Sequence, residues 1–316
     1  IEVQNLKKIY KNGPEALKGI TLAIPQGSFY GLLGPNGAGK TTTIGIITGL
    51  VNITSGSVTI MGHDSVNDFR NARKLIGLSP QELNFDVFFS MEELLELQAG
   101  YYGLPYKEAK ERAALMLQQF GLTEKRKSRA RELSGGMKRR VQIAKALVHD
   151  PPIVILDEPT AGVDIELRHM LWDYLLKINK DGKTILLTTH YIEEAEQLCE
   201  TVSIIDDGKI IATNSPEKLT QAHGMSGLEI SISSSLDNLD LDSLNFKKID
   251  GRIYVDTHNP EKNMADIISK ISNQRGMIEN VRIYRSSLED VFMKLTGRSI
   301  QDETDNIEPQ EKILDV

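Results

Sequence analysis

The segment spanning residues 34–41 (GPNGAGKT) constrains the fold of this chain more than any other. It matches the pattern G-x-x-x-x-G-K-[ST], whose glycines let the backbone wrap a polyphosphate so that several N–H groups point inward. Residues 28–33 before it predict a short buried strand, and residues 40–47 predict the start of a helix. This strand–loop–helix context favours a phosphate-binding loop over a glycine-rich turn followed by a chance Lys-Thr.

The loop assigns distinct tasks to its residues. The positive end of the helix dipole favours phosphate at this point of the chain. We expect Lys40 to reach the β- and γ-phosphates and the Thr41 hydroxyl to hold Mg²⁺. The nucleotide-binding residues predicted in this segment are Gly34, Pro35, Asn36, Gly37, Ala38, Gly39, Lys40, Thr41 and Thr42.

A second apolar segment ends in two carboxylates. Residues 153–156 are apolar on both faces, as a central parallel strand should be, and Asp157 and Glu158 follow them. Because side chains alternate along a strand, we expect the two carboxylates to point to opposite sides. We predict that Asp157 binds Mg²⁺ and that Glu158 is the general base for the attacking water. A strand that merely ends in solvated acids would not need two apolar faces.

A third motif, residues 133–137 (LSGGM), precedes an amphipathic stretch over 141–148. Ser134, Gly135 and Gly136 would form a second helix N-terminus with bare backbone N–H groups, which is another anion site. A helix cap after a turn would look similar, but this motif lies upstream of the carboxylate-bearing strand. One chain would then carry two phosphate sites for each ATP.

In these motifs and their order, residues 1–222 resemble the ATPase subunit of an ABC transporter. The resemblance implies that Tyr10 stacks on adenine, and that Gln81 contacts Mg²⁺ and water and relays to a membrane partner. It also implies that Asp164 crosses a dimer interface and that His190 bonds the γ-phosphate. The family often has Ser-Ala-Leu before this Asp, and this chain has Ala-Gly-Val, so only the Asp carries over.

The resemblance also implies an architecture and a mode of action. We expect an α/β phosphate-loop ATPase domain with a RecA-like core, an antiparallel β-subdomain and a helical subdomain. Two head-to-tail copies would sandwich two ATP molecules, close on binding them and reopen after hydrolysis. The signature variant at residues 137–140 (MKRR) and the segment 287–298 resemble ATPases of ABC-2-type and drug-resistance exporters.

Composition excludes other classes. The formal net charge is −7 and no basic footprint of a nucleic-acid binder stands out, so we expect no nucleic acid as a partner. No apolar run approaches the ~20 residues that span a bilayer, and no secretory signal is visible at the first residues. Cys199 is the single cysteine. We therefore expect a cytoplasmic protein, peripheral to the inner membrane and bound to separate polytopic membrane subunits.

The chain divides into three predicted parts. An ATP-binding domain covers residues 1–222, opens with antiparallel strands and contains the helical subdomain at about 86–140. A small α+β domain covers 225–298 without a catalytic constellation, and we read it as a dimerisation or bracing module rather than a ligand sensor. The acidic tail 299–316 is expected to be disordered. The strands expected in the second domain are 228–232, 252–256 and 281–284, with helices at 260–274 and after a capping box at 286–289.

Several alternatives stay open at this stage. Phe85, Phe88 and Phe89 could line a groove for a membrane-subunit helix or pack in the helical subdomain. The chain could also be a soluble ABC ATPase acting on ribosomes or DNA, although it has one ATPase domain and one cysteine. A regulator that binds without turnover would lack a base, whereas Glu158 is present. The transported substance cannot be read from these residues.

Overall fold

The computed structural model describes residues 1–11, 13–224, 226–232, 246–249, 252–257, 260–273 and 277–297, with the side chains of 247–249 excepted. The acidic tail at 299–316, expected to be disordered, lies outside the described residues. Contacts divide the chain into two compact units, of which the first spans Ile1–Ser215 and the second begins at Pro216. None of the described helices combines the length and the apolar character that a bilayer crossing requires.

A six-stranded sheet forms the centre of the first unit. Its order is β10-β9-β3-β8-β7-β6, and every neighbouring pair is parallel except the antiparallel pair β10–β9. Every residue of β3, β7 and β8 is buried, as expected of the central strands of a parallel sheet. The strands are β3 (Phe29–Leu33), β6 (Ile76–Ser79), β7 (Ile153–Asp157), β8 (Thr184–Thr189), β9 (Thr201–Asp206) and β10 (Lys209–Asn214).

A second, antiparallel sheet contains the opening strands, as the sequence predicts. Its order is β2-β1-β4-β5, built from β1 (Glu2–Ile9), β2 (Glu15–Ala23), β4 (Ser55–Ile60) and β5 (His63–Asp64). One buried apolar cluster includes Leu6 of this sheet, Ile46 of the helix after the phosphate loop and Ile155 of β7. The two sheets therefore share one core, which fixes the antiparallel strands beside the phosphate loop.

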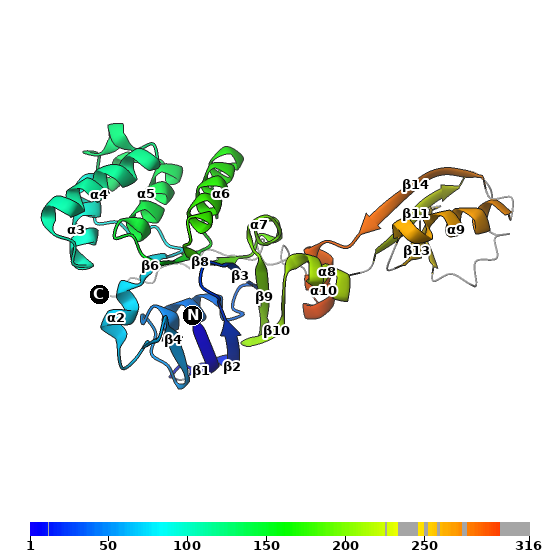
Figure 1. The fold of residues 1–316 in the computed structure, drawn as a ribbon, viewed down its shortest axis with the longest axis horizontal. Helices are drawn as coiled ribbons and strands as arrows, with labels where there is room; N and C mark the ends of the chain where they lie inside the picture. The colour runs from blue at the N-terminus through cyan, green and yellow to red at the C-terminus, as the bar shows by residue number, and fades with distance from the viewer. Residues whose placement is uncertain are drawn as a thin grey trace, which may run out of the picture. The chain divides into compact units, whose positions relative to one another are not determined.

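Helices complete the first unit. Figure 1 shows α3, α4 and α5 grouped together, and α3 contacts both of the others. They occupy the region in which we expected a helical subdomain. Helix α5 begins at Gly135 with Ser134 as its N-cap, where the sequence predicts a helix N-terminus. The helices are α1 (Lys40–Ile47), α2 (Phe69–Lys74), α3 (Met91–Tyr101), α4 (Tyr106–Gln119), α5 (Gly135–Leu147), α6 (Ile165–Lys180) and α7 (Ile192–Leu198), with 3₁₀ turns at Thr123–Lys125 and Ala130–Glu132.

A capping box lies at the start of α3, and its contribution to the stability of the protein can be tested. The Ser90 hydroxyl accepts from Glu93 N, while the Glu93 carboxylate accepts from Ser90 N at 2.8 Å. Ser90→Ala should lower the free energy of unfolding by about 1 kcal/mol, because it leaves helical N–H groups without an acceptor. Glu111→Ala, at an exposed position of α4, should change it by less than about 0.5 kcal/mol. Urea denaturation of both variants checks this, and equal effects would contradict it.

The second unit is an α+β layer in which a helix covers an antiparallel sheet. The sheet has the order β12-β13-β11-β14, and α9 places Ile267 and Ile271 against Leu228 and Ile253. Figure 1 shows α9 lying along this sheet. The elements are α8 (Pro216–His223), β11 (Ser226–Ile232), β12 (Phe246–Ile249), β13 (Arg252–Asp256), α9 (Pro260–Asn273), β14 (Ile278–Arg285) and α10 (Leu288–Thr296).

Three details of the second unit differ from the sequence prediction. Strand β12 was not predicted, and helix α8 packs against α10 although we counted its residues with the ATP-binding domain. The final capping box is formed by Ser287 and Asp290, so the expected Ser286–Glu289 pair is wrong by one residue. Both pairs satisfy the same four-residue pattern, and the one-residue difference depends on which residue leaves the helical conformation first.

Candidate functional site

The phosphate loop connects β3 to α1, as predicted, and its shape depends on glycine. Gly37 and Gly39 have φ angles of 77° and 111°, in the left-handed region that favours glycine. A Cβ atom on Gly34 would lie 2.3 Å from the Ile205 carbonyl oxygen, so a larger residue would collide with backbone. The loop therefore approaches β9 closely and leaves its own N–H groups near the start of α1.

Lys40 lies inside this loop rather than in solvent. Its ammonium donates to the carbonyl oxygens of Gly34 at 2.7 Å and Pro35 at 3.1 Å. It also lies 3.8 Å from Glu158 Oε1, and both side chains are only 5% exposed. A buried cation beside the loop N–H groups supplies the positive charge that a polyphosphate requires.

Asp157 and Thr41 meet at the end of β7. The Thr41 hydroxyl donates to Asp157 Oδ2 at 3.3 Å, and the Thr188 hydroxyl donates to Asp157 Oδ1. Burial raises the pKa of Asp157 above its ordinary range, with the Thr188 bond opposing the rise and Glu158 adding to it. A nearby divalent cation would reverse this by favouring the ionised carboxylate.

The donor set around Asp157 fits Mg²⁺. A hydroxyl and a carboxylate are the hard oxygen ligands that this ion prefers, and Mg²⁺ commonly completes its shell with phosphate oxygens and water. Within the described ranges, no group of three or more His, Cys, Asp or Glu side chains could hold a metal alone. The chain would therefore share Mg²⁺ with the nucleotide instead of enclosing it.

The predicted strand alternation does not hold at Glu158. Strand β7 ends at Asp157, and Glu158 has a φ angle of 48°, so the alternation of a strand does not extend to it. The positive φ turns its carboxylate toward the phosphate loop, beside Lys40. Gln81 Nε2 donates to Glu158 Oε2 at 2.9 Å, and His190 Nδ1 lies 3.2 Å from Glu158 Oε1. Three predicted site residues thus surround one carboxylate.

The charge state of Glu158 follows from these neighbours. Burial by itself would raise the pKa of Glu158, but His190, Lys40 and Arg139 outweigh burial and hold the pKa below its ordinary value. A carboxylate kept ionised in a buried site can accept a proton from a water molecule. The geometry therefore suits a general base.

Tyr10 stands at the edge of the loop and its helix. Its side chain is exposed, and its hydroxyl lies 3.3 Å from Thr42 Oγ1 in α1. The ammonium of Lys8 lies 4.8 Å from the ring centroid. An exposed aromatic ring next to a phosphate loop is available for stacking on a base.

The remaining predicted residues lie at two helix starts. Ser134 caps α5 by accepting from Met137 N at 3.3 Å, and Asp164 caps α6 by accepting from Leu167 N at 2.8 Å. A Cβ atom on Gly136 would lie 2.7 Å from Leu167 Cδ2, which places the two helix starts side by side. Ser134 and Asp164 thus have local structural roles in addition to the roles that the resemblance implies.

Two buried residues that were not predicted as site residues hold the Gln81 segment. Arg139 donates to the carbonyl oxygens of Pro80 and Gln81, and Gln142 Nε2 donates to those of Pro80 at 2.6 Å and Glu82 at 2.8 Å. Both are 4% exposed. A basic run beside a helix start usually indicates a solvated surface, so the sequence carried no signal for these contacts.

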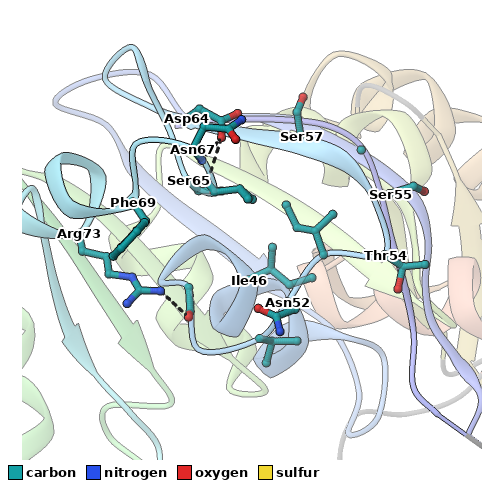
Figure 2. Close-up of a pocket in the computed structure, with 15 residues that line it drawn as sticks. Ile46, Asn52, Thr54, Ser55, Ser57, Asp64, Ser65, Asn67, Phe69 and Arg73 are labelled. Atoms are coloured by element: carbon teal, nitrogen blue, oxygen red, sulfur yellow. Dashed lines mark hydrogen bonds between the residues drawn. The ribbon is translucent and has the colours of Figure 1, made fainter.

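A separate cavity of about 790 Å³ lies between the end of α1, β4 and α2 (Figure 2). Arg73 lines one side and donates to the Gly49 carbonyl oxygen at 2.8 Å, while Asp64 accepts from Val66 N and Asn67 N. None of the predicted site residues belongs to its lining. The cavity is therefore distinct from the candidate nucleotide site.

Comparison with known proteins identifies relatives of this chain. The family model described as "ABC transporter" matches residues 17–161. The linearmycin resistance ATP-binding protein LnrL of Bacillus subtilis is 34% identical, over 96% of this chain and 100% of that protein. The Nod factor export ATP-binding protein I of Burkholderia orbicola is 35% identical, over 96% of this chain and 98% of its own.

Solved structures give a related result for the fold. A dimeric ATP-binding cassette in a post-hydrolysis state, bound to ADP and Pi, aligns with a TM-score of 0.63 and 30% identity. The alignment covers 68% of this chain and 97% of that chain. The fold of this chain therefore has a counterpart that was solved as a dimer bound to ADP and Pi.

Proposed function

The chain belongs to the ABC transporter family as an ATP-hydrolysing, export-type subunit, and we propose that it energises an ABC-2-type exporter together with separate membrane subunits. The observation that carries the proposal is the convergence of Lys40, Glu158, Gln81 and His190 around one point next to the phosphate loop. These groups come from four segments of the chain, and their convergence beside a phosphate loop supports a role in ATP hydrolysis.

The residues divide the reaction between them. Lys40 and the loop N–H groups bind the β- and γ-phosphates, and Thr41 and Asp157 would hold Mg²⁺, which when bound neutralises charge developing on the phosphates. Glu158 accepts the proton of the attacking water, and Gln81 orients that water through its bond to Glu158. His190 contacts the γ-phosphate and stabilises its charge, while Tyr10 stacks on adenine.

A second copy of the chain would complete each site. Ser134, Gly135 and Gly136 lie at the start of α5, where backbone N–H groups form an anion site. In a head-to-tail dimer this start faces the γ-phosphate held by the other copy, with Asp164 nearby on α6. ATP binding would favour the closed dimer and hydrolysis would release it, which makes two conformations available to a partner.

The membrane subunit would bind on the helical subdomain. A hollow of about 570 Å³ on α3 and α4 is lined by apolar side chains that include Phe89, Leu97, Tyr101 and Tyr106. Tyr101 is 84% exposed and nearby Phe88 is 74% exposed, which is unusual for large apolar side chains on a soluble surface. Glu93 and Glu96 share the lining, so the hollow suits a helix with an apolar face and basic neighbours.

The subunit would then lie at the cytoplasmic face of the inner membrane. One relative is named for linearmycin resistance and the other for Nod factor export, and the second name describes removal of a substance from the cell. Selection of the exported substance would belong to the membrane subunit, since the predicted residues here all serve ATP.

Affinity purification tests this proposal. The tagged chain, extracted gently from membranes of its host, should co-purify with a multi-span membrane protein. Tyr101→Ser should reduce that recovery by about tenfold, because it removes an exposed aromatic anchor, without changing ATP hydrolysis. Val66→Ser, another exposed apolar position, is the matched control and should leave recovery unchanged. Recovery of ribosomes or DNA with no membrane protein would reject the exporter role in favour of a soluble ABC ATPase.

A further inference from the structure

Glu194 of α7 is a fully buried carboxylate that the proposed chemistry does not use. Its exposed fraction is 0%, and three neutral groups donate to it. The Thr189 hydroxyl donates to Oε2 at 2.6 Å, the Trp172 indole N–H donates to Oε1 at 3.2 Å, and the Thr160 hydroxyl also donates to Oε1. Burying a carboxylate costs free energy unless it is well hydrogen-bonded, and the three donors around Glu194 compensate for that cost.

Two of these donors, Thr160 and Thr189, lie in the segments that carry Glu158 and His190. Thr160 follows Glu158 by two residues, and Thr189 is the last residue of β8, directly before His190. Both threonines are 0% exposed. Glu194 therefore connects the loop after β7 to the loop after β8 through side chains alone.

The end of β8 is held on both of its faces. Thr188 donates to Asp157, and Thr189 donates to Glu194, because consecutive strand residues point to opposite sides. Tyr191 N in turn donates to Thr189 Oγ1 at 2.8 Å, which shapes the backbone on the far side of His190. The position of His190 beside Glu158 thus depends on Thr189.

The third donor extends the connection to α6. Trp172 lies on the helix that Asp164 caps, and its ring is also buried. Through these three donors, Glu194 connects the segment before His190, the segment after Glu158 and helix α6. A single carboxylate can do this because each of its oxygens accepts more than one hydrogen bond.

We propose that Glu194 is a positioning residue that holds the Glu158 and His190 loops as one unit, so that both groups meet the γ-phosphate together. The inference rests on the proposed roles of Glu158 and His190 in hydrolysis. Displacement of a reacting group by about 1 Å can reduce turnover by about 100-fold, so loss of this connection should affect the chemical step more than binding.

Threonine-to-valine variants test the connection, because valine keeps the shape and loses the hydroxyl. Thr160→Val and Thr189→Val should each lower kcat about 10- to 100-fold while the KM for ATP changes less than about twofold. Thr184→Val is the matched control: this buried threonine lies at the other end of β8, and its hydroxyl accepts from Gly27 N at 2.9 Å. Thr184→Val should lose about as much thermal stability as Thr160→Val and Thr189→Val, but its kcat should stay at the wild-type value.

Substitution of Glu194 itself separates positioning from general stability. Glu194→Ala should lower kcat as strongly as the valine variants, and Glu194→Gln should recover part of the loss because its amide oxygen still accepts from Thr160 and Trp172. If all variants lose thermal stability equally and keep kcat, Glu194 has only a structural role and the inference is wrong.

Hydrogen exchange gives a second readout that does not depend on turnover. In Glu194→Ala, amides of 158–161 and of 189–191 should exchange faster together, whereas Thr184→Val should leave both segments unchanged. Faster exchange in only one segment would overturn the proposed connection. A wild-type chain that never hydrolyses ATP would instead reject the proposed function, while the exchange result would still decide the role of Glu194.

Discussion

Replacing Glu158 with glutamine should stop ATP turnover while ATP binding persists. Glutamine keeps the size of the side chain and can still bond Gln81, but it cannot accept a proton from water. General-base catalysis contributes about 10²- to 10⁴-fold, so kcat should fall by at least about 100-fold. Lys40 and the phosphate loop remain, and the affinity for ATP should therefore change little.

A dimer trapped in the presence of ATP is the second expected result for Glu158→Gln. If ATP closes the two copies and hydrolysis reopens them, a chain that binds without turnover should accumulate as a dimer. Phosphate release and size-exclusion chromatography with and without ATP measure the two effects. Glu193→Gln, an exposed glutamate close to His190, is the control and should behave as wild type.

The pH dependence of turnover distinguishes the base from a merely structural carboxylate. The pKa of Glu158 is held below its ordinary value by His190, Lys40 and Arg139 despite burial. A base must be deprotonated to act, so turnover should persist as pH falls and decline only below the ordinary glutamate pKa of about 4.3. In the separate substitution experiment, hydrolysis by Glu158→Gln at the wild-type rate would show that Glu158 is not the general base.

The parts of the site that were predictable are those in which the local backbone carries the chemistry. The phosphate loop works through its own N–H groups and glycine conformations, so its residues identify it wherever they occur. Asp157 was predictable because a strand buried on both faces ends there. In each case a run of neighbouring residues contained the information.

The parts that were not predictable depend on contacts between distant segments or on a single dihedral angle. The alternation rule does not apply to Glu158 because its φ angle is positive, which the apolar strand before it does not indicate. Arg139 and Glu194 were not predicted to belong to the site, yet both are buried and bonded to partners from other segments. Burial of a charge is a tertiary property, since it requires donors or acceptors that only the fold brings together.

The second unit illustrates the same difference. Strands β11 and β13 have alternating apolar residues and were predicted, whereas β12 is four residues long and contains two adjacent lysines. Its position follows from pairing with β13, with Phe246 opposite Val255. Strand pairing of this kind compensates for weak local preference, because context outweighs propensity in sheets.

A mixed dimer provides the most direct test of sites shared between two copies. Lys40→Ala removes a charge from the site of its own chain, and Ser134→Arg places bulk and charge at the start of α5, which would face the site of the other chain. Each variant alone forms dimers in which both sites are defective, so each should lose about 100-fold of its activity or more. A dimer with one copy of each variant keeps one intact site and combines both defects in the other.

Recovery of activity on mixing therefore distinguishes a shared site from two independent ones. The mixed dimer should regain up to about half of the wild-type rate, because the two sites of a symmetric dimer are equivalent. Two differently tagged chains, co-expressed and purified through both tags, give the mixed dimer. The Ser134→Arg chain alone, measured by denaturation, gives the stability lost with the helix cap, which should be about 1 kcal/mol. If Ser134→Arg alone stays active, or if the mixed dimer stays inactive while each chain is folded, the signature does not act across the interface.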